Sequence, residues 1–124
     1  MEASLEIEGT WQPLRAELEG VLAPEMAMSK MEFRLQSGRY RVQFGGQTSD
    51  EGDYSVTVEP AQIMLTLRGI RGTNAGREIP AIVQLRGDRL RVCYGLNGVR
   101  PAEFVSGPGS GRYLVTYRRK QARR

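Results

Sequence analysis

Histidine is absent from the 124-residue chain, and cysteine occurs once, at Cys93. Without histidine the chain has no Ser-His-Asp or Cys-His catalytic set, and it lacks the commonest transition-metal ligand. A single cysteine forms no disulfide within the chain and no cysteine-rich zinc site. We therefore expect a protein that is not an enzyme and that holds no metal and no cofactor.

Long apolar runs are also absent. No segment approaches the ~18 apolar residues of a membrane helix, so we expect no membrane span. The N-terminal stretch MEASLEIEG carries early glutamates and no basic region, which does not fit a signal peptide. Together with the lone cysteine, these features predict a cytoplasmic location. The length predicts one domain.

Lysine is scarce, and the basic charge is unevenly placed. Residues 118–124, RRKQARR, hold five of the 18 basic residues, so the remainder of the chain is close to neutral. A short basic end of this kind is usually a solvated terminus. We therefore predict one domain over residues 1–117 and a basic tail over 118–124, and nucleic acid is not an expected partner.

Alternation of apolar and polar residues with a period of two recurs along the chain and is typical of half-buried β-strands. Met31, Phe33 and Leu35 share one face of such a run, for example. Glycine-containing dipeptides at Ser37–Gly38 and Gly87–Asp88 separate consecutive runs and predict hairpin turns. The predicted strands are residues 9–20, 31–36, 39–45, 53–59, 62–69, 79–86, 89–95 and 112–119.

Eight strands joined mostly by tight turns predict an all-β, antiparallel, up-and-down barrel, because closure removes exposed strand edges. A β-sandwich is the alternative. Pro13 interrupts the first strand and predicts a bulge or an edge there, since proline cannot donate to a ladder. Residues 24–30 are the expected short helix, with Pro24 near its start. The cluster Asp50, Glu51 and Asp53 lacks the order of a calcium loop and is explained as a turn.

The connection from Gly95 to Gly111 is long for a compact domain, and such loops tend to be functional or to cover something. Phe104 is its large apolar anchor. One hypothesis is that the loop crosses a barrel mouth and that Phe104 plugs a small apolar cavity. Tyr40, Tyr54 and Tyr94 would then line this cavity, and Arg100 would meet a ligand carboxylate. The alternative is that Phe104 completes a filled core without a cavity.

Two sets of motifs carry a family resemblance. Gly9–Thr10–Trp11 with a late arginine is similar to the signature of the lipocalin and fatty-acid-binding superfamily. Leu90–Tyr94, Arg100–Phe104 and Pro108–Gly111 resemble a family of uncharacterised lipocalin-like domains that is expanded in planctomycetes. The resemblance covers residues 9–120 and departs from the family pattern at Pro13.

The resemblance implies a lipocalin-like barrel without an assigned activity. It also implies that Gly9, Trp11 and an arginine of the last strand, Arg118 or Arg119, close one end of the barrel, with the arginine packed over the indole.

The predicted function is non-enzymatic binding of a small apolar or amphipathic molecule in a barrel cavity, or of another protein. The alternative is a protein-interaction or weak nucleic-acid-binding module. That module would use the basic tail and the outward arginines Arg34, Arg39, Arg41, Arg86, Arg89 and Arg91.

Overall fold

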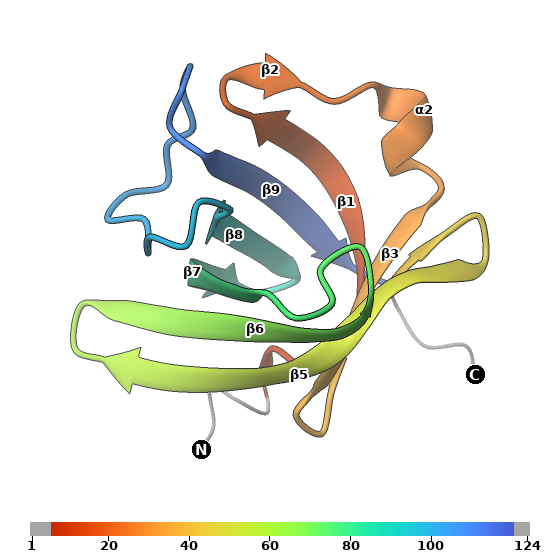
Figure 1. The fold of residues 1–124 in the computed structure, drawn as a ribbon, viewed down its shortest axis with the longest axis horizontal. Coiled ribbons are helices and arrows are strands. Elements are labelled where there is room, and N and C mark those ends of the chain that lie inside the picture. The colour runs from red at the N-terminus through yellow and green to blue at the C-terminus, as the bar shows by residue number, and fades with distance from the viewer. Residues whose placement is uncertain (1–5, 121–124) are drawn as a thin grey trace.

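The alternating runs form antiparallel strands in the computed structural model, which describes residues 6–120 (Figure 1). A short helix, α2 (Glu25–Met28), follows the second strand. The strands are β1 (Gly9–Leu18), β2 (Val21–Leu22), β3 (Met31–Gln36), β4 (Arg39–Phe44), β5 (Gln47–Glu59), β6 (Gln62–Gly72), β7 (Glu78–Arg86), β8 (Arg89–Gly95) and β9 (Arg112–Arg119).

Pairing between β1 and β9 closes the sheet into a barrel. Each strand from β3 to β8 pairs antiparallel with the next one, and β1 pairs with both β3 and β9. The β1–β9 ladder runs from Trp11 opposite Arg119 to Leu18 opposite Tyr113. This closure confirms the predicted eight-stranded up-and-down barrel over the sandwich. The two-residue β2 is an additional strand on β1.

Pro13 lies at a bulge in β1. The register with β9 shifts between Pro13 and Arg15, so Leu14 is the extra residue of the bulged strand. A bulge tolerates a residue that cannot donate to the ladder, which explains proline within a paired strand. Of the two predictions for Pro13, the bulge is confirmed.

The connections alternate between two ends of the barrel because neighbouring strands run in opposite directions. The predicted turns Ser37–Gly38 and Gly87–Asp88 both lie at the end that also contains residues 6–8, which we call the closed end. The other end, called the open end, is formed by the turn Gly45–Gly46, the connection 73–77 and the loop 96–111 (Figure 1).

Trp11 is fully buried at the closed end, and Arg119 covers it. The guanidinium carbon of Arg119 lies 4.3 Å from the centroid of the indole. The same guanidinium donates hydrogen bonds to the carbonyl oxygens of Glu8 and Glu6, each at 2.7 Å. The Arg119 side chain of the last strand therefore holds residues 6–8, which precede the first strand, against the closed end.

Gly9 fits this arrangement and Arg118 does not. A Cβ at Gly9, where φ is +140°, would lie 2.8 Å from Nη1 of Arg119, so a larger residue would strain the closure. Arg118 is exposed and stands opposite Gln12 in the ladder. Successive strand residues face opposite sides, so the arginine over Trp11 is Arg119, and the assignment of Arg118 to barrel closure is corrected.

Strand β5 begins at Gln47, earlier than the predicted start at Asp53. Asp50, Glu51 and Asp53 therefore lie within a strand that is paired on both sides, and their assignment to a turn is wrong. The turn before β5 is Gly45–Gly46 instead. Asp and Gly favour turns when only local hydrogen bonds are considered, but pairing with β4 and β6 prevails here.

Two other boundaries differ from the sequence-based ones. Helix α2 spans four residues, Glu25–Met28, and is shorter than the predicted 24–30. Strand β9 continues to Arg119, so the predicted boundary between a domain of residues 1–117 and a tail of 118–124 falls inside a strand. The last part of the predicted tail, residues 121–124, lies outside the described residues.

The loop 96–111 covers the outer wall of the barrel. Cys93 and Ile82 stand opposite each other on β8 and β7 and are both fully buried, although their neighbours in sequence form the interior core. The Sγ atom of Cys93 lies 3.8 Å from the carbonyl oxygen of Val105, in the loop. The long loop therefore shields apolar side chains that point away from the barrel interior.

Candidate functional site

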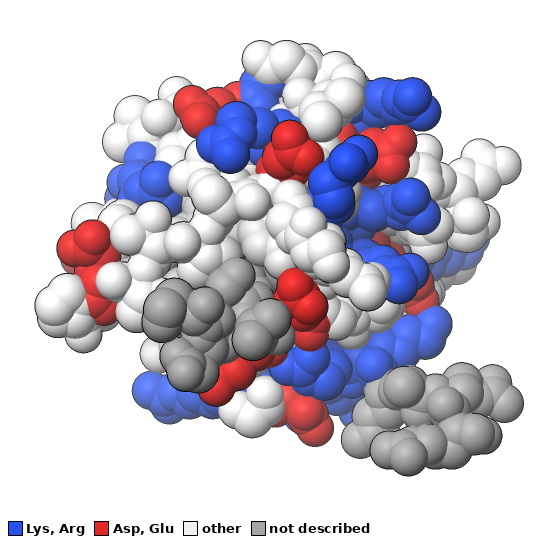
Figure 2. All heavy atoms as spheres, turned by 90° about the horizontal axis from the view of Figure 1, so that it is seen from below, with Lys and Arg blue, Asp and Glu red and all other residues white. Residues whose placement is uncertain are grey.

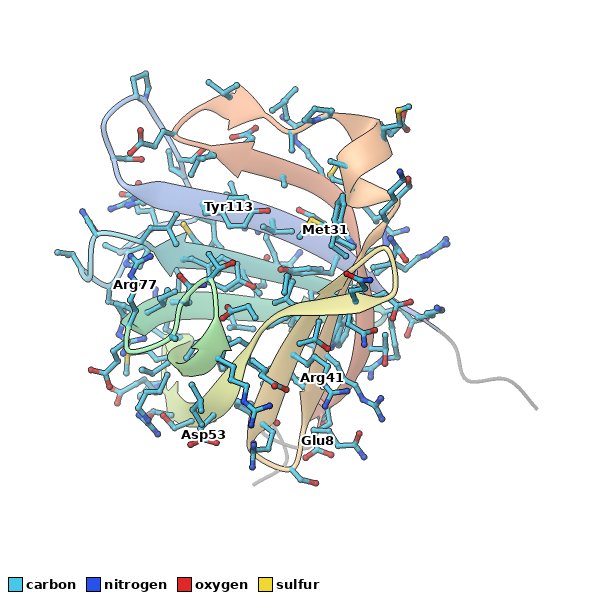
Figure 3. All side chains as sticks on the ribbon, turned by 45° about the vertical axis from the view of Figure 1, so that its right-hand side comes forward. Glu8, Met31, Arg41, Asp53, Arg77 and Tyr113 are labelled. Carbon is cyan, nitrogen blue, oxygen red and sulfur yellow. The ribbon has the colours of Figure 1, made fainter. Side chains whose placement is uncertain are left out.

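The barrel interior holds a cavity of about 230 Å³ at the open end. Every strand from β3 to β9 contributes to its wall, together with Pro13 of β1. The cavity therefore exists only when the barrel is closed. Its apolar and aromatic side chains include Phe33, Leu67, Ile79, Tyr94, Tyr113 and Tyr117. In Figure 3 Tyr113 and Met31, two lining residues, lie toward the interior, whereas Arg41 and Asp53 lie on the outer side.

Aromatic rings form one side of the cavity. The hydroxyl oxygens of Tyr94 and Tyr117 are 2.7 Å apart, so one hydroxyl donates to the other. Phe33 stacks on Tyr117 with ring centroids 5.3 Å apart, and Tyr113 stacks on Tyr94 at 5.7 Å. Burial raises the pKa of both Tyr94 and Tyr117 well above the ordinary value. Both phenols therefore stay neutral near pH 7 and keep their protons as hydrogen-bond donors.

Asp50 faces this aromatic side and is the one buried charged residue among residues 6–120, with 5% of its surface exposed. Its Oδ2 accepts hydrogen bonds from the Tyr40 hydroxyl at 3.1 Å and from Nδ2 of Asn74 at 2.8 Å. Its Oδ1 accepts from the backbone N–H of Asn74 at 3.1 Å. These donors offset the cost of burying a carboxyl group. Burial, with a smaller contribution from the Asp50 charge, raises the pKa of Tyr40.

A chain of hydrogen bonds fixes Asp50 to the rim of the open end. Asn74 lies in the connection 73–77, and its Oδ1 accepts from Nη1 of Arg77 at 3.0 Å. Nη2 of Arg77 donates to the carbonyl oxygen of Leu96 at 2.6 Å. Leu96 begins the loop 96–111 and also lines the cavity. The rim is thus held in one arrangement by contacts between β5, the connection and the loop.

The three tyrosines of the predicted site occupy different positions. Tyr94 lines the cavity. Tyr40 is buried beneath it and reaches it through the hydrogen bond to Asp50. Tyr54 lies toward the closed end, where its backbone N–H donates to the carbonyl oxygen of Gly38. The Tyr54 hydroxyl is buried without a hydrogen-bond partner among the described residues, and burial raises its pKa.

Arg100, in the loop 96–111, forms hydrogen bonds with strands β6 and β7 of the barrel wall. Its Nη1 donates to the carbonyl oxygens of Leu65 at 3.0 Å and Ala81 at 2.8 Å, and its Nη2 donates to Oγ1 of Thr66 at 3.0 Å. Thr66 stands opposite Pro80, which has no N–H for the ladder between β6 and β7. Arg100 therefore supplies donors at a point where that ladder is weakened.

Phe104 lies on the outer face of β8, with its ring centroid 4.4 Å from the guanidinium carbon of Arg91. Arg91 alternates with the inward-facing Leu90 and Val92, so this contact is on the outside of the barrel. Neither Phe104 nor Arg100 lines the cavity. The predicted roles of Phe104 as a plug and of Arg100 as the partner of a ligand carboxylate do not fit this geometry.

Asp50, Tyr113 and Tyr117 are among the cavity residues that the sequence-based prediction does not include. Counting back from Tyr54 in steps of two places Asp50 on the inward face, and the same alternation places Tyr113 and Tyr117 inward along β9. The signal was present for all three. Around Asp50, however, the turn-forming composition outweighs this alternation.

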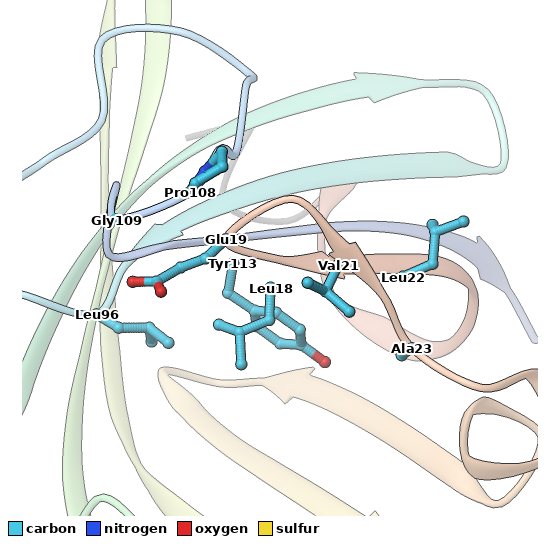
Figure 4. Close-up of a pocket in the computed structure, with 9 residues that line it drawn as sticks. All are labelled: Leu18, Glu19, Val21, Leu22, Ala23, Leu96, Pro108, Gly109 and Tyr113. Carbon is cyan, nitrogen blue, oxygen red and sulfur yellow. The ribbon is translucent and has the colours of Figure 1, made fainter.

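A shallow groove of about 760 Å³ borders the mouth of the cavity (Figure 4). It lies between the β1–β2 hairpin and the loop 96–111. Leu18, Val21 and Leu22 line it and are 48%, 71% and 56% exposed. Leu96 and Tyr113 line both the groove and the interior cavity. These two side chains therefore stand between the cavity and an exposed apolar surface.

Some arginines on the outer faces of the strands pair with acidic side chains. Arg39 pairs with Asp53 at 3.4 Å, and Arg41 and Arg71 lie 3.5 and 3.8 Å from Glu51. Basic and acidic side chains are interspersed over the face drawn in Figure 2. Exposed pairs of this kind contribute little to stability, but they neutralise each other's field.

The fold and the site together define a closed antiparallel β-barrel with an aromatic cavity at one end. Within residues 6–120, no helix has the length and apolar character that crossing a bilayer would require, and no three metal-ligating side chains of the types His, Cys, Asp and Glu are grouped to hold an ion. Comparison with protein-family models, with curated proteins and with solved structures gave no match.

Proposed function

We propose that this protein binds a small apolar or amphipathic molecule inside the barrel, without transforming it. The observation that carries the proposal is the interior cavity, which is walled by aromatic rings and shares Leu96 and Tyr113 with an exposed apolar groove. Ligand pockets are typically concave and apolar with a few polar groups that orient the ligand. Asp50 and the Tyr94–Tyr117 hydroxyl pair are such groups.

The size of the cavity limits the ligand. One water occupies about 30 Å³ in the liquid, so the 230 Å³ cavity has the space of roughly seven or eight waters. This space suits a single ring or a short chain of carbons. A longer apolar tail would extend over Leu96 and Tyr113 into the groove, where Leu18 and Val21 would contact it.

The alternative function, an interaction module that uses the basic tail and the outward arginines, has weaker support. Arg39 and Arg41 are engaged with acidic neighbours. Arg119 belongs to the closed end, and Arg91 is stacked against Phe104. Residues 121–124 of the tail lie outside the described part of the chain.

Native mass spectrometry and displacement of a hydrophobic fluorescent dye test the proposal. We expect short-chain amphiphiles to displace the dye from the purified protein. Leu67→Phe places a larger side chain in the cavity wall and should weaken displacement, because it occupies ligand volume. Val58→Phe is the matched control, since Val58 is 54% exposed and lies outside the cavity lining.

The proposal fails if no compound in a broad panel of small apolar and amphipathic molecules is retained or displaces the dye. It also fails if Leu67→Phe, shown by circular dichroism to be folded, binds the panel as the unaltered protein does. Equal weakening in Val58→Phe would likewise place the binding outside the cavity.

A further inference from the structure

Acidic side chains line the cavity without basic ones. The lining residues include two carboxylic acids, Glu32 and Asp50, and no lysine or arginine. Glu32 accepts a hydrogen bond from Nζ of Lys120 and so has its own cation. Asp50 has no salt-bridge partner among residues 6–120, and its three described donors are the neutral groups of Tyr40 and Asn74.

We propose that the cavity binds a small organic cation, a protonated amine on an apolar body, with the amine directed at Asp50. This inference rests on the proposed function and specifies the chemical class of the ligand. A buried carboxylate is stabilised most strongly by an opposite charge with N–H donors, because charge-assisted hydrogen bonds are about twice as strong as neutral ones.

Asp50 has an acceptor site left for such a ligand. An ionised carboxylate has about four lone-pair sites. Its Oδ2 already accepts from Tyr40 and from Asn74 Nδ2, whereas Oδ1 accepts from the Asn74 N–H alone. The free site is therefore on Oδ1. An ammonium group, which has three donors and no acceptor, matches it.

The aromatic side of the cavity favours the same ligand. Phe33, Tyr94, Tyr113 and Tyr117 place four rings around a space of about 230 Å³. The faces of aromatic rings attract cations, and the attraction grows when the cation is removed from water. The apolar body of the ligand would pack against Leu67 and Ile79, which also line the cavity.

An anionic ligand fits poorly. A carboxylate inside the cavity would share a low-dielectric space with Asp50, and like charges at close range disfavour each other strongly. Arg100, the arginine expected to meet a ligand carboxylate, donates instead to Leu65, Ala81 and Thr66. The charge of Asp50 therefore disfavours a carboxylate head group, such as that of a fatty acid, and favours a protonated amine.

Three probes with the same carbon chain test the inference: hexylamine, 1-hexanol and hexanoate, titrated at neutral pH and followed by nitrogen–proton correlation NMR of the labelled protein. We expect hexylamine to bind at least about tenfold more tightly than hexanoate, the ratio that one charge-assisted hydrogen bond supplies. The amide signals of Asp50, Asn74 and Tyr94 should shift on binding, because these residues surround the predicted ammonium position.

Asp50→Asn removes the charge with little change in volume and should reduce hexylamine affinity about tenfold while leaving 1-hexanol affinity nearly unchanged. Asp53→Asn is the matched control. Asp53 lies on the same strand, but its side chain is 46% exposed and pairs with Arg39 outside the barrel. This control should bind hexylamine as the unaltered protein does.

The outcomes separate this inference from the proposed function. If 1-hexanol or hexanoate binds as tightly as hexylamine, or if folded Asp50→Asn keeps full hexylamine affinity, the cationic ligand is wrong and the cavity still binds small amphiphiles. If none of the three probes binds, the cationic ligand is overturned, and the broad panel described above decides the proposed function separately. If Asp50→Asn does not fold, the ranking of the three probes on the unaltered protein decides alone.

Discussion

Arg119 covers the indole of Trp11 and thereby joins the last strand of the barrel to the first. Its guanidinium carbon lies 4.3 Å from the ring centroid, and its two terminal nitrogens bond to the carbonyl oxygens of Glu8 and Glu6. Trp11 is also directly opposite Arg119 in the β1–β9 ladder. The contact that closes the barrel therefore combines backbone pairing, hydrogen bonding and a cation–π interaction in one residue.

Arg119→Ala should lower the free energy of unfolding by about 2–4 kcal/mol, because it removes two charged hydrogen bonds and the cation–π contact. Arg118→Ala is the control and should change it by less than about 0.5 kcal/mol, since Arg118 is exposed. Urea denaturation followed by tryptophan fluorescence measures both, because Trp11 is the single tryptophan of the chain. Equal effects of the two substitutions would contradict the assigned closure.

Arg100→Ala should lower the free energy of unfolding by about 2–3 kcal/mol, because the hydrogen bonds from Arg100 to the carbonyl oxygens of Leu65 and Ala81 and to Oγ1 of Thr66 are lost. Ligand affinity should stay unchanged, since Arg100 does not line the cavity. Arg39→Ala, at an exposed ion pair, should have almost no effect on stability. If folded Arg100→Ala binds an anionic amphiphile more weakly, Arg100 is the partner of a ligand carboxylate, as the sequence predicts.

The tyrosines should ionise only at strongly alkaline pH. Burial raises the pKa of Tyr40, Tyr54, Tyr94, Tyr113 and Tyr117, all five tyrosines of the chain. A raised pKa in the folded state means that the unfolded chain loses protons first. The buried phenols therefore contribute fully to the free energy of unfolding at pH values below their ordinary pKa of 10.0. This contribution falls as the pH rises above that value. Ultraviolet titration should show phenolate appearing together with loss of the circular dichroism of the fold. A tyrosine that titrates at its ordinary pKa in folded protein would be inconsistent with this burial.

Cys93 should be almost inert in the folded protein. Burial raises the pKa of its thiol, so less of the reactive thiolate is present at a given pH, and the loop 96–111 blocks access. Labelling by a thiol reagent should be at least about tenfold slower than in urea and should accelerate as pH rises toward the raised pKa.

Phe104→Ala should speed the labelling of Cys93, because it removes the contact with Arg91 that holds the loop to β8. Val99→Ala, at a 64% exposed position in the same loop, is the control and should leave the rate unchanged. Fast labelling of the unaltered folded protein would show that the loop does not cover the outer wall as described.

Much of the fold was predictable because strand alternation is a local property. The turn at Gly87–Asp88 and the inward faces of β3, β7 and β8 follow directly from residues that are close in sequence. At Asp50, residues close in sequence do not predict the structure correctly. Its surroundings in sequence favour a turn, and only pairing with β4 and β6 makes it part of a wall.

The candidate site was less predictable because its residues meet across the barrel. Asp50 and Asn74 are 24 residues apart, and Tyr94 and Tyr117 are 23 apart. The sequence predicts Phe104 in the cavity because it is the large apolar residue of its loop. Nothing local to the loop specifies whether it folds across the mouth or along the outer wall.

The amino-acid pattern alone determined antiparallel strands joined by tight turns and favoured a barrel over a sandwich, because each strand's faces and turns depend on neighbouring residues. Tertiary structure decided which arginine covers Trp11, where the long loop lies, and that a carboxyl group faces four aromatic rings. These outcomes depend on the register between β1 and β9 and on side chains packed from opposite walls. Such long-range geometry is set by the packing of the whole barrel and is not encoded in any single segment.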